Sequence, residues 1–222
     1  MKRISILSLL FILTVSCSTY PIIHPVKSLG IAEIRNKCQG VFPVGKWRFV
    51  HFIDATLPGK KRIFMMGITQ IYPEKKKIHC ILMTIEGLVV FDALYDGKII
   101  INRAILPFNS DKFAKGMISD LRLIFFQPEG PCVEAGVSDT GNWICRYQTD
   151  EATTVDVVIH FDNRWTIRRY RHHRLDRAIQ AYFGNDSDLA TKNKIPERLE
   201  LIARGGQEYS LNLKLIEATP IQ

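Results

Sequence analysis

The residues with the greatest capacity for chemistry in this sequence are its cysteines, four of which lie well inside the chain at positions 38, 80, 132 and 145. In an oxidising compartment, four cysteines permit two disulfides with three possible connectivities. Cys132 and Cys145 are the candidate pair that lies closest in the sequence. Their disulfide would close a loop of about 14 residues, which stabilises a fold by about 3 kcal/mol in the chain-entropy model. The alternative is a buried free thiol, and Cys80, which lies within an apolar run, is a candidate for that state. The spacings do not match a zinc site, so no metal is predicted.

No enzyme signature accompanies these cysteines. The sequence contains no G-x-S-x-G, no H-E-x-x-H, no Walker loop and no G-x-G-x-x-G. His172 and His173, with Asp176 nearby, are the one combination of histidine and carboxylate that is worth testing. Neighbouring residues on a strand point to opposite faces, so the two histidines are poorly placed to bind one ion. We therefore predict a protein that is not an enzyme and that has no cofactor.

The fifth cysteine, Cys17, lies in a different setting at the N-terminus. Lys2 and Arg3 precede an apolar run, Ile4–Val15, which has the length of a signal-peptide core and is short for a membrane span. A small residue stands directly before Cys17, and this pattern resembles a bacterial lipobox. The resemblance implies cleavage before Cys17 and acylation of that residue, and Ser18 after it implies sorting to the outer membrane. An ordinary secretory signal is the alternative.

The chain is basic, with a formal net charge of +8. Such a charge favours anionic lipid head groups or acidic partners. It does not select nucleic acid, since no zinc-finger, helix-turn-helix or RNP-like pattern is present. Arg168, Arg169 and Arg171 lie among aromatic residues and are candidates for contact with phosphate head groups, which suit the guanidinium fork. The alternative is an ordinary solvated strand face.

The elements that must position these residues are centred on residues 77–101. The apolar runs Ile78–Met83, Leu88–Leu94 and Ile99–Ile101 predict three consecutive antiparallel strands, and Asp96-Gly97 predicts a hairpin turn between the last two. Both faces of these strands are apolar, whereas a strand with one wet face alternates apolar and polar residues. We therefore expect an apolar element, or an element and a ligand, to cover the second face.

Two helices are predicted, over Ser28–Lys37 and over Asp111–Phe125. The second has apolar residues at helical spacing on one side, so it is a natural cover for the sheet. With about nine or ten antiparallel strands, the chain is predicted to be mainly β with helices (α+β), as an unclosed antiparallel β-barrel wrapped around helices. Residues 127–141 are predicted to be a loop rich in Pro and Gly. We expect a signal peptide at residues 1–16, a lipidated tether at 17–27 and a single domain at 28–222.

Three stretches of the sequence resemble the LolA/LolB superfamily, and most closely the LolB-like outer-membrane lipoproteins. They are Ile78–Ile101 with its strand-loop-strand and Asp-Gly turn, Ile105–Gly130 with MISDLR leading to QPEG, and Ile195–Glu217 as the closing hairpin. The resemblance implies an unclosed, strongly curved sheet with helices across its mouth and an apolar cavity for acyl chains. It also implies lipid or lipidated protein as cargo, a periplasmic carrier protein as a possible donor, and a lipid-anchored location on the periplasmic side of the outer membrane.

Candidate residues for these roles can be named. Phe64, Met66, Phe91, Leu121 and Phe125 are predicted to line the acyl cavity. The resemblance assigns membrane insertion to an apolar residue in the loop between central strands, which is Ile85 here; the alternative is a buried strand-end residue. A structural or assembly lipoprotein whose cavity is filled by its own side chains remains the second hypothesis for the whole protein.

Overall fold

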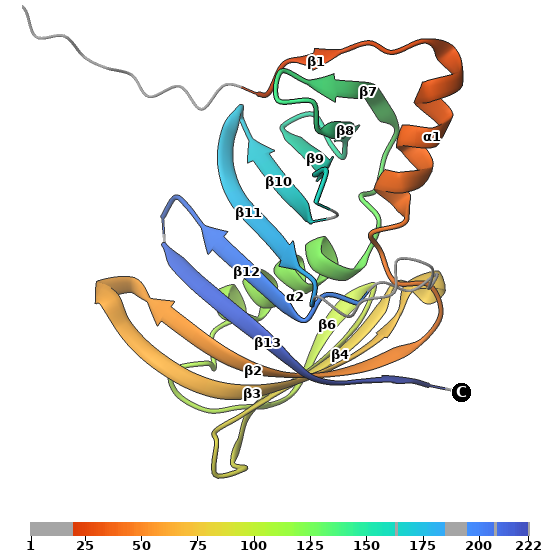
Figure 1. Ribbon diagram of the computed structural model, residues 1–222. Helices are drawn as coiled ribbons and strands as arrows, with labels where there is room; N and C mark the ends of the chain where they lie inside the picture. Colours follow the sequence, from red (N-terminus) through yellow and green to blue (C-terminus); the bar gives the residue numbers. More distant parts are fainter. Residues whose placement is uncertain (1–19, 163, 185–194, 207, 222) are drawn as a thin grey trace, which may run out of the picture.

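The computed structural model describes residues 20–162, 164–184, 195–206 and 208–221. In this part of the chain, thirteen strands form one sheet in the order β1-β7-β8-β9-β10-β11-β12-β13-β2-β3-β4-β5-β6. Every neighbouring pair is antiparallel, and the edge strands β1 and β6 are not paired with each other. The sheet curves strongly around one of two helices (Figure 1). The prediction of a mainly β fold with an unclosed antiparallel sheet and two helices is confirmed.

The strands and helices follow each other along the chain with short connections. Their bounds are β1 (Ile23–His24), α1 (Ser28–Gln39), β2 (Trp47–Leu57), β3 (Lys61–Tyr72), β4 (Lys77–Met83), β5 (Val89–Asp96), β6 (Lys98–Ala104), α2 (Asp111–Phe125), β7 (Cys132–Ser138), β8 (Trp143–Gln148), β9 (Thr153–Ile159), β10 (Trp165–Arg171), β11 (Arg174–Tyr182), β12 (Arg198–Ala203) and β13 (Tyr209–Pro220).

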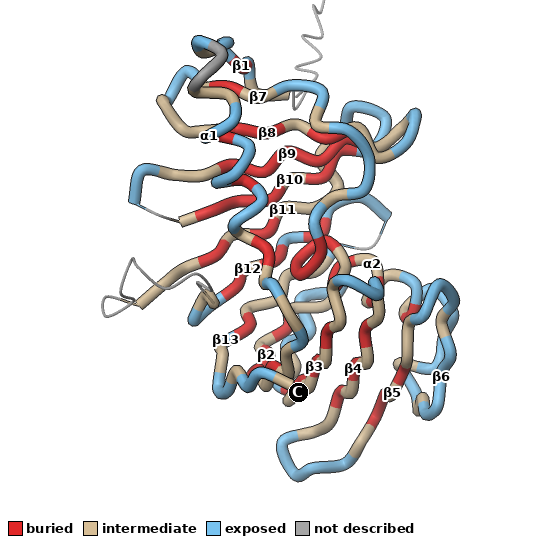
Figure 2. Tube along the Cα trace, turned by 90° about the vertical axis from the view of Figure 1, so that its right-hand side faces the viewer, coloured by how far each residue is buried: buried red, intermediate tan, exposed pale blue. Residues whose placement is uncertain are grey.

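Helix α2 has the bounds that the sequence predicts and fills the hollow of the sheet. The Ser110 hydroxyl caps its first turn by accepting a hydrogen bond from the Phe113 amide at 3.1 Å, which satisfies one of the amides that lack a partner inside the helix. Its inward side is apolar and buried, with Ile118 2% exposed and Ile124 4% exposed. The helix therefore forms the centre of the main hydrophobic core (Figure 2).

Helix α1 packs against β7, β8 and β9 at the other end of the sheet. A disulfide joins Cys38 on this helix to Cys145 on β8, with a Cα–Cα distance of 6.3 Å. The predicted pairing of Cys132 with Cys145 is therefore wrong. In the register of β7 with β8, Cys132 lies opposite Tyr147 and Cys145 lies opposite Ala135, so the two cysteines are offset along the strands. Cys80 and Cys132 are free thiols, and Cys80 is buried within β4.

Three strands were not predicted, and each lacks the apolar alternation that marks a half-buried strand. Strand β7 lies in the segment predicted to be a loop, because Glu134 and Gly136 interrupt its apolar residues. Strand β11 carries charged residues whose partners are on other elements. Strand β1 is only Ile23–His24, paired with β7. Such polar or very short strands take their hydrogen bonds from neighbours that the local sequence does not reveal.

The N-terminal segment is bound to the sheet, so the predicted tether at 17–27 is too long. Ile23 is 8% exposed. The Pro21 carbonyl accepts a hydrogen bond from Arg146 at 3.0 Å, and the Tyr20 ring lies 4.6 Å from the ring of Tyr170. The segment from Tyr20 onward is thus part of the fold, whereas the predicted signal peptide and Cys17 lie outside the described residues.

Candidate functional site

The alternation of buried and exposed residues along β3 decides which side chains can line an internal site. Met65, Gly67, Thr69 and Ile71 are buried, whereas Phe64, Met66 and Ile68 are exposed or half-buried. The prediction that Phe64 and Met66 line an internal cavity is therefore wrong. Side chains alternate between faces with a period of two, so assigning the strand to the wrong parity moves every residue to the other face.

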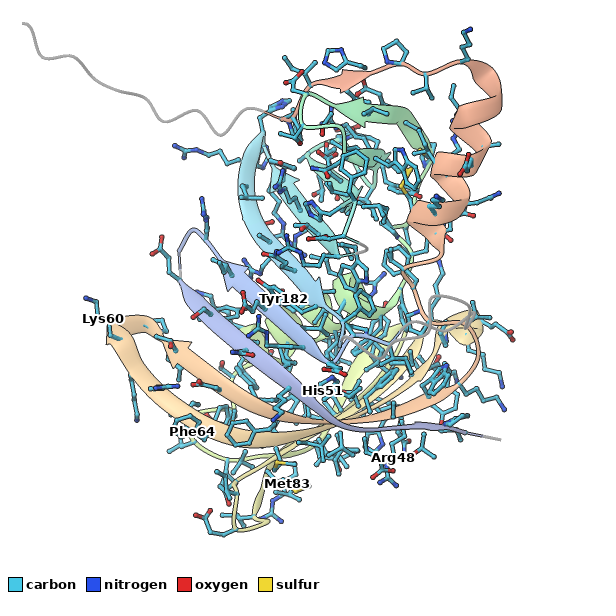
Figure 3. All side chains as sticks on the ribbon, in the orientation of Figure 1. Arg48, His51, Lys60, Phe64, Met83 and Tyr182 are labelled. Carbon is cyan, nitrogen blue, oxygen red and sulfur yellow. A yellow bond between two sulfur atoms is a disulfide. The ribbon has the colours of Figure 1, made fainter. Side chains whose placement is uncertain are left out.

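Phe64 lies instead on the convex face of the sheet, away from α2 (Figure 3). Its side chain is 44% exposed and its ring stacks on that of Phe52, with 5.9 Å between centroids. The guanidinium carbon of Arg62 lies 5.0 Å from the same ring, so a cation covers part of its face. Apolar side chains thus lie on both faces of β3, and α2 covers the concave face.

The other three predicted cavity residues lie inside the molecule. Phe91 is fully buried and meets the ring of Phe113 edge-on, with 5.2 Å between centroids. Phe125 stacks on Phe49 at 5.0 Å, and Leu121 is 8% exposed. The structure thus brings these residues together between α2 and the concave face, as members of a packed core.

A small apolar pocket lies at one end of this core, where the C-terminal end of α2 meets β2, β10 and β12. Its free volume is about 20 Å³, which corresponds to roughly one water molecule. Phe125 is the one predicted cavity residue that lines it. The full lining is Val41, Pro43, Phe49, His51, Ile124, Phe125, Trp165, Ile195, Pro196 and Leu199.

Two of the lining residues carry polar groups, and sequence reasoning missed both. His51 points toward α2 (Figure 3) and is 4% exposed. Burial lowers its pKa from 6.5 to about 4, so the imidazole is neutral at physiological pH. Trp165 is 4% exposed, and its indole N–H has no hydrogen-bond partner within the described part of the chain. Strand alternation places the His51 and Trp165 side chains on one face of the sheet. No local sequence signal, however, predicts that β2 and β10 line the same pocket.

Helix α2 is fastened to the sheet by a set of polar contacts that we call the helix clamp: Ser119, Asp120, Arg169, Asp176, Arg177 and Tyr209. Asp120, 4% exposed, accepts hydrogen bonds from Arg177 at 2.9 Å and from the Tyr209 hydroxyl. Burial in the first place, and the Asp120 carboxylate in the second, raise the pKa of Tyr209. The hydroxyl therefore stays protonated and remains a donor to Asp120.

Arg169 belongs to this clamp, so its predicted role in head-group binding is wrong. It is 6% exposed and donates two hydrogen bonds to Asp176, both at 2.9 Å, and one to the Ser119 hydroxyl at 2.8 Å. Strand alternation places it on the concave face. Arg168 lies on the opposite face, in register with Asp156. Arg171 is 54% exposed by its side chain and lies 3.3 Å from Asp176, so the three arginines do not form one surface cluster.

Ile85 lies in the turn between β4 and β5 and is 57% exposed. The turn is closed by the Thr84 amide, which donates to the Leu88 carbonyl at 2.9 Å, and by the Gly87 amide, which donates to Thr84 at 3.0 Å. Gly87 has a φ of +92°, which only glycine adopts without strain. The turn projects from the end of the molecule opposite to β1 (Figures 1 and 2). Ile85 is therefore not a buried strand-end residue, and its role in membrane insertion stays a prediction.

A larger depression, of about 650 Å³, lies between the tips of the β2–β3 and β12–β13 hairpins. Lys60, Arg204 and Glu208 line it beside Leu57 and Ile202, and it is open to solvent. Despite its size, this depression is a poor site for an acyl chain, because it would leave most of the chain in contact with water. The small apolar pocket is the better candidate, because it is less open to solvent.

No group of three or more His, Cys, Asp or Glu side chains is placed to hold a metal ion within the described ranges. His172 and His173 have φ values of 47° and 62° and form the turn between β10 and β11, so they are not strand residues as predicted. In the part of the chain that the structure describes, we find no helix with the length and apolarity that crossing a membrane requires.

Comparison with known proteins rests on structure alone. No protein-family model matches the sequence, and no curated protein matches it either. Among solved structures, a LolA superfamily protein from Nitrosomonas europaea is similar, with a TM-score of 0.51 and 12% sequence identity. The match covers 86% of this chain and 94% of the other. At this identity the match shows a similar architecture alone, and it agrees with the unclosed antiparallel sheet around α2 described above. This chain has a LolA-like fold.

Proposed function

We propose that this protein binds an acyl chain between α2 and the concave face of the sheet, and that its cargo is a lipid or a lipidated protein. The observation that supports this most directly is the apolar pocket at the end of α2, in a fold like that of a LolA superfamily protein. Each methylene that leaves water for such a site contributes about 0.8 kcal/mol. Binding and release need no covalent chemistry, so the absence of catalytic signatures in the sequence is consistent with the proposal.

The free space of about 20 Å³ is too small for a chain, so binding requires side chains to move. Helix α2 is the element whose movement would enlarge the pocket, since Ile124 and Phe125 form one of its walls. The helix clamp holds α2 by hydrogen bonds and ion pairs, which can exchange for contacts with water. Movement of α2 would therefore break no covalent bond.

A second function is favoured by the tight packing of the same core. Phe125 stacks on Phe49 and Phe91 meets Phe113, so the concave face is filled by the chain's own aromatic side chains. A structural or assembly lipoprotein with this fold and no lipid transfer would have such an interior. The two functions differ in one measurable property, which is binding of an apolar ligand.

We infer that the protein is anchored in the outer membrane through an acylated Cys17 and faces the periplasm. The support is the order of charged residues, apolar run, small residue and cysteine, followed by Ser18. Only Ser18 and Thr19 separate Cys17 from Tyr20, a span of about 10 Å when extended. Because Tyr20 and Pro21 contact Tyr170 and Arg146, such an anchor would hold the β1 end of the molecule close to the membrane.

This short connection places a condition on the proposed insertion role of Ile85. The β4–β5 turn lies at the end of the molecule opposite to β1 (Figure 1). Ile85 could reach the bilayer that holds Cys17 only after Tyr20 and Pro21 leave the sheet. A longer spacer inserted between Thr19 and Tyr20 should therefore raise the rate of transfer to the anchoring membrane, and an unchanged rate would argue against insertion there. A periplasmic carrier protein that brings the cargo could contact the exposed turn while Tyr20 and Pro21 stay on the sheet.

Lipid binding is tested with the chain from Ser18 to Gln222, which keeps every described element. A fluorescent apolar probe should bind it and be displaced by acyl compounds, and lipid should be found in the purified protein by mass spectrometry. A stably folded protein that neither binds the probe nor carries lipid would favour the structural function.

The insertion role is tested by replacing Ile85 with glutamate. Because Ile85 is 57% exposed, the change should alter the free energy of unfolding by less than about 0.5 kcal/mol. Probe binding should be kept, while transfer of the probe to anionic vesicles should be lost, since a carboxylate opposes entry into the bilayer. Leu88→Glu in the same turn, 51% exposed, is the matched variant. Unchanged transfer in both would exclude the turn.

A further inference from the structure

We propose that the pocket at the end of α2 is a subsite for the carbonyl group of an acyl ester or amide, with the Trp165 indole N–H as the hydrogen-bond donor. This inference rests on the proposed acyl-chain function and names the part of the ligand that the protein recognises. The ligand class is therefore an uncharged acyl lipid or the acylated end of a lipoprotein, and free fatty acid is disfavoured.

The first observation is an unpartnered donor. Trp165 is 4% exposed, and its indole N–H makes no hydrogen bond to any of the residues that the structure describes. Buried donors almost always have a partner, because an unsatisfied one loses the hydrogen bonds that water gave it. By contrast, the indole N–H of Trp47 donates to the Val44 carbonyl at 2.9 Å. Among the tryptophans in the described ranges, Trp165 is the one whose donor is both buried and unpartnered.

The second observation is the position of the Trp165 side chain. Trp165 lines the pocket together with Phe49 and Phe125, whose stacked rings form an apolar wall. A carbonyl oxygen on the Trp165 N–H would have its first methylenes against this wall. The polar atom of the ligand and its apolar chain would then each meet a matching surface, which is the usual arrangement in a small-molecule site.

The third observation is the absence of charge among the ten residues that line the pocket. His51 is the one ionisable side chain among them, and burial lowers its pKa to about 4, so it is neutral at pH 7. A carboxylate would therefore enter without a cation to pair with it, and an unpaired buried charge is strongly disfavoured. An ester or amide carbonyl accepts a hydrogen bond without bringing a charge, so the pocket should discriminate against free acids.

The experiment uses three ligands of similar chain length: methyl laurate, dodecyl methyl ether and laurate. Affinities are measured at pH 7.5 by displacement of N-phenylnaphthylamine from the chain Ser18–Gln222. The ester should bind up to about five- to ten-fold more tightly than the ether, because the ether oxygen is a weaker acceptor than the carbonyl oxygen and one hydrogen bond contributes about that factor. Laurate should bind more weakly than the ester by at least the same factor.

Trp165→Phe removes the donor and keeps most of the apolar wall. In this variant, the ratio of ester to ether affinity should fall to about one, whatever the affinity for the ether itself. Trp143→Phe is the matched control, because Trp143 lies outside the pocket and is covered by Lys37, 3.6 Å from its ring centroid. The control should keep the wild-type ratio.

A spectroscopic measurement separates this role from a structural one. The carbonyl stretch of ¹³C-labelled methyl laurate should move to lower frequency on binding to the wild type, as expected for an accepted hydrogen bond, and should stay unshifted in Trp165→Phe. Equal affinity of the wild type for ester and ether, or an unshifted carbonyl band, would overturn the subsite alone. Failure of all three ligands to displace the probe would overturn the acyl-binding function as well. If Trp165→Phe does not fold, the affinities of the wild type for the three ligands and the carbonyl band of the bound ester still test the subsite.

Discussion

The two helices cover the same face of one sheet, but they are attached to it in different ways. Helix α1 is joined to β8 by the disulfide between Cys38 and Cys145. Helix α2 is attached by apolar packing and by the helix clamp, in which Asp120 and Ser119 accept from Arg177 and Arg169. A covalent bond permits no separation, whereas hydrogen bonds and ion pairs can be replaced by water. On this comparison, we expect α2 rather than α1 to be the helix that moves when a ligand binds.

Two parts of the sheet, β8–β10 and β2–β4, also differ in how far their outer faces are covered. Over β8–β10, Tyr20 and Pro21 cover the outer face, and Asp156 is fully buried in a bidentate pair with Arg146 at 2.8 and 2.9 Å. Over β2–β4, Phe64 is 44% exposed. One end of the sheet is thus covered on both faces, whereas the other is covered by α2 on one face only. The pocket lies between these ends, because Trp165 belongs to β10 and Phe49 and His51 belong to β2.

Removing the disulfide should give the largest effect. Cys38 and Cys145 are 107 residues apart, and the chain-entropy model gives about 4 to 5 kcal/mol for closing a loop of that size. Cys38→Ser should lower the free energy of unfolding by this amount, measured by denaturant titration under oxidising conditions. Cys132→Ser, at a half-exposed free cysteine, should change it by less than about 0.5 kcal/mol. Equal losses in the two variants would contradict the assignment of α1 as the fixed helix.

Breaking the helix clamp should come next. Asp120→Ala removes the carboxylate that pairs with the buried Arg177 guanidinium. Removing one member of a buried ion pair lowers the free energy of unfolding by about 3 to 5 kcal/mol. Hydrogen exchange should show lower protection of the amides of α2 and unchanged protection of α1. The control is Glu33→Ala, which removes an exposed ion pair with Lys37 within α1 and should have an effect below about 0.5 kcal/mol. Equal loss of protection in both helices would remove the distinction between them.

The pH dependence of stability should sharpen the comparison further. His51 has a pKa lowered from 6.5 to about 4, so between these values the unfolded chain binds more protons than the folded one. Stability is then complete above pH 6.5 and falls by about 3 kcal/mol as the pH drops to about 4. His51→Gln should make this loss smaller in thermal unfolding followed from pH 7 to pH 4. His160, which burial also shifts to a lower pKa, is half-buried in the α1 half, and His160→Gln should have a smaller effect.

The smallest effect is expected on the convex face. Phe64→Ala should lower the free energy of unfolding by less than about 1 kcal/mol, because the side chain is 44% exposed. Phe91→Ala removes a fully buried ring and should lower the free energy of unfolding by about 3 to 5 kcal/mol. Urea titration of the two variants measures the difference. A loss at Phe64 as large as that at Phe91 would mean that the convex face is a second core.

The sequence by itself determined the features that depend on local pattern. The helical spacing of apolar residues predicted α2 with its observed bounds, and Asp96-Gly97 predicted the hairpin between β5 and β6. The order of the strands and the resemblance to the LolA/LolB superfamily predicted an unclosed antiparallel sheet around helices. Local propensity and turn chemistry act within a few residues, so they can be recognised without knowing the rest of the fold.

The tertiary structure alone decided how distant residues combine. The partner of Cys145 depends on how α1 packs on β8, which no spacing reveals. The face to which Phe64 and Met66 point depends on the register of β3, and a shift of one residue reverses it. The assignment of Arg169 to a clamp, and of Trp165 and His51 to one pocket, requires the curvature that brings β2, β10 and α2 together. These are long-range contacts, and their geometry is set by packing of the whole sheet.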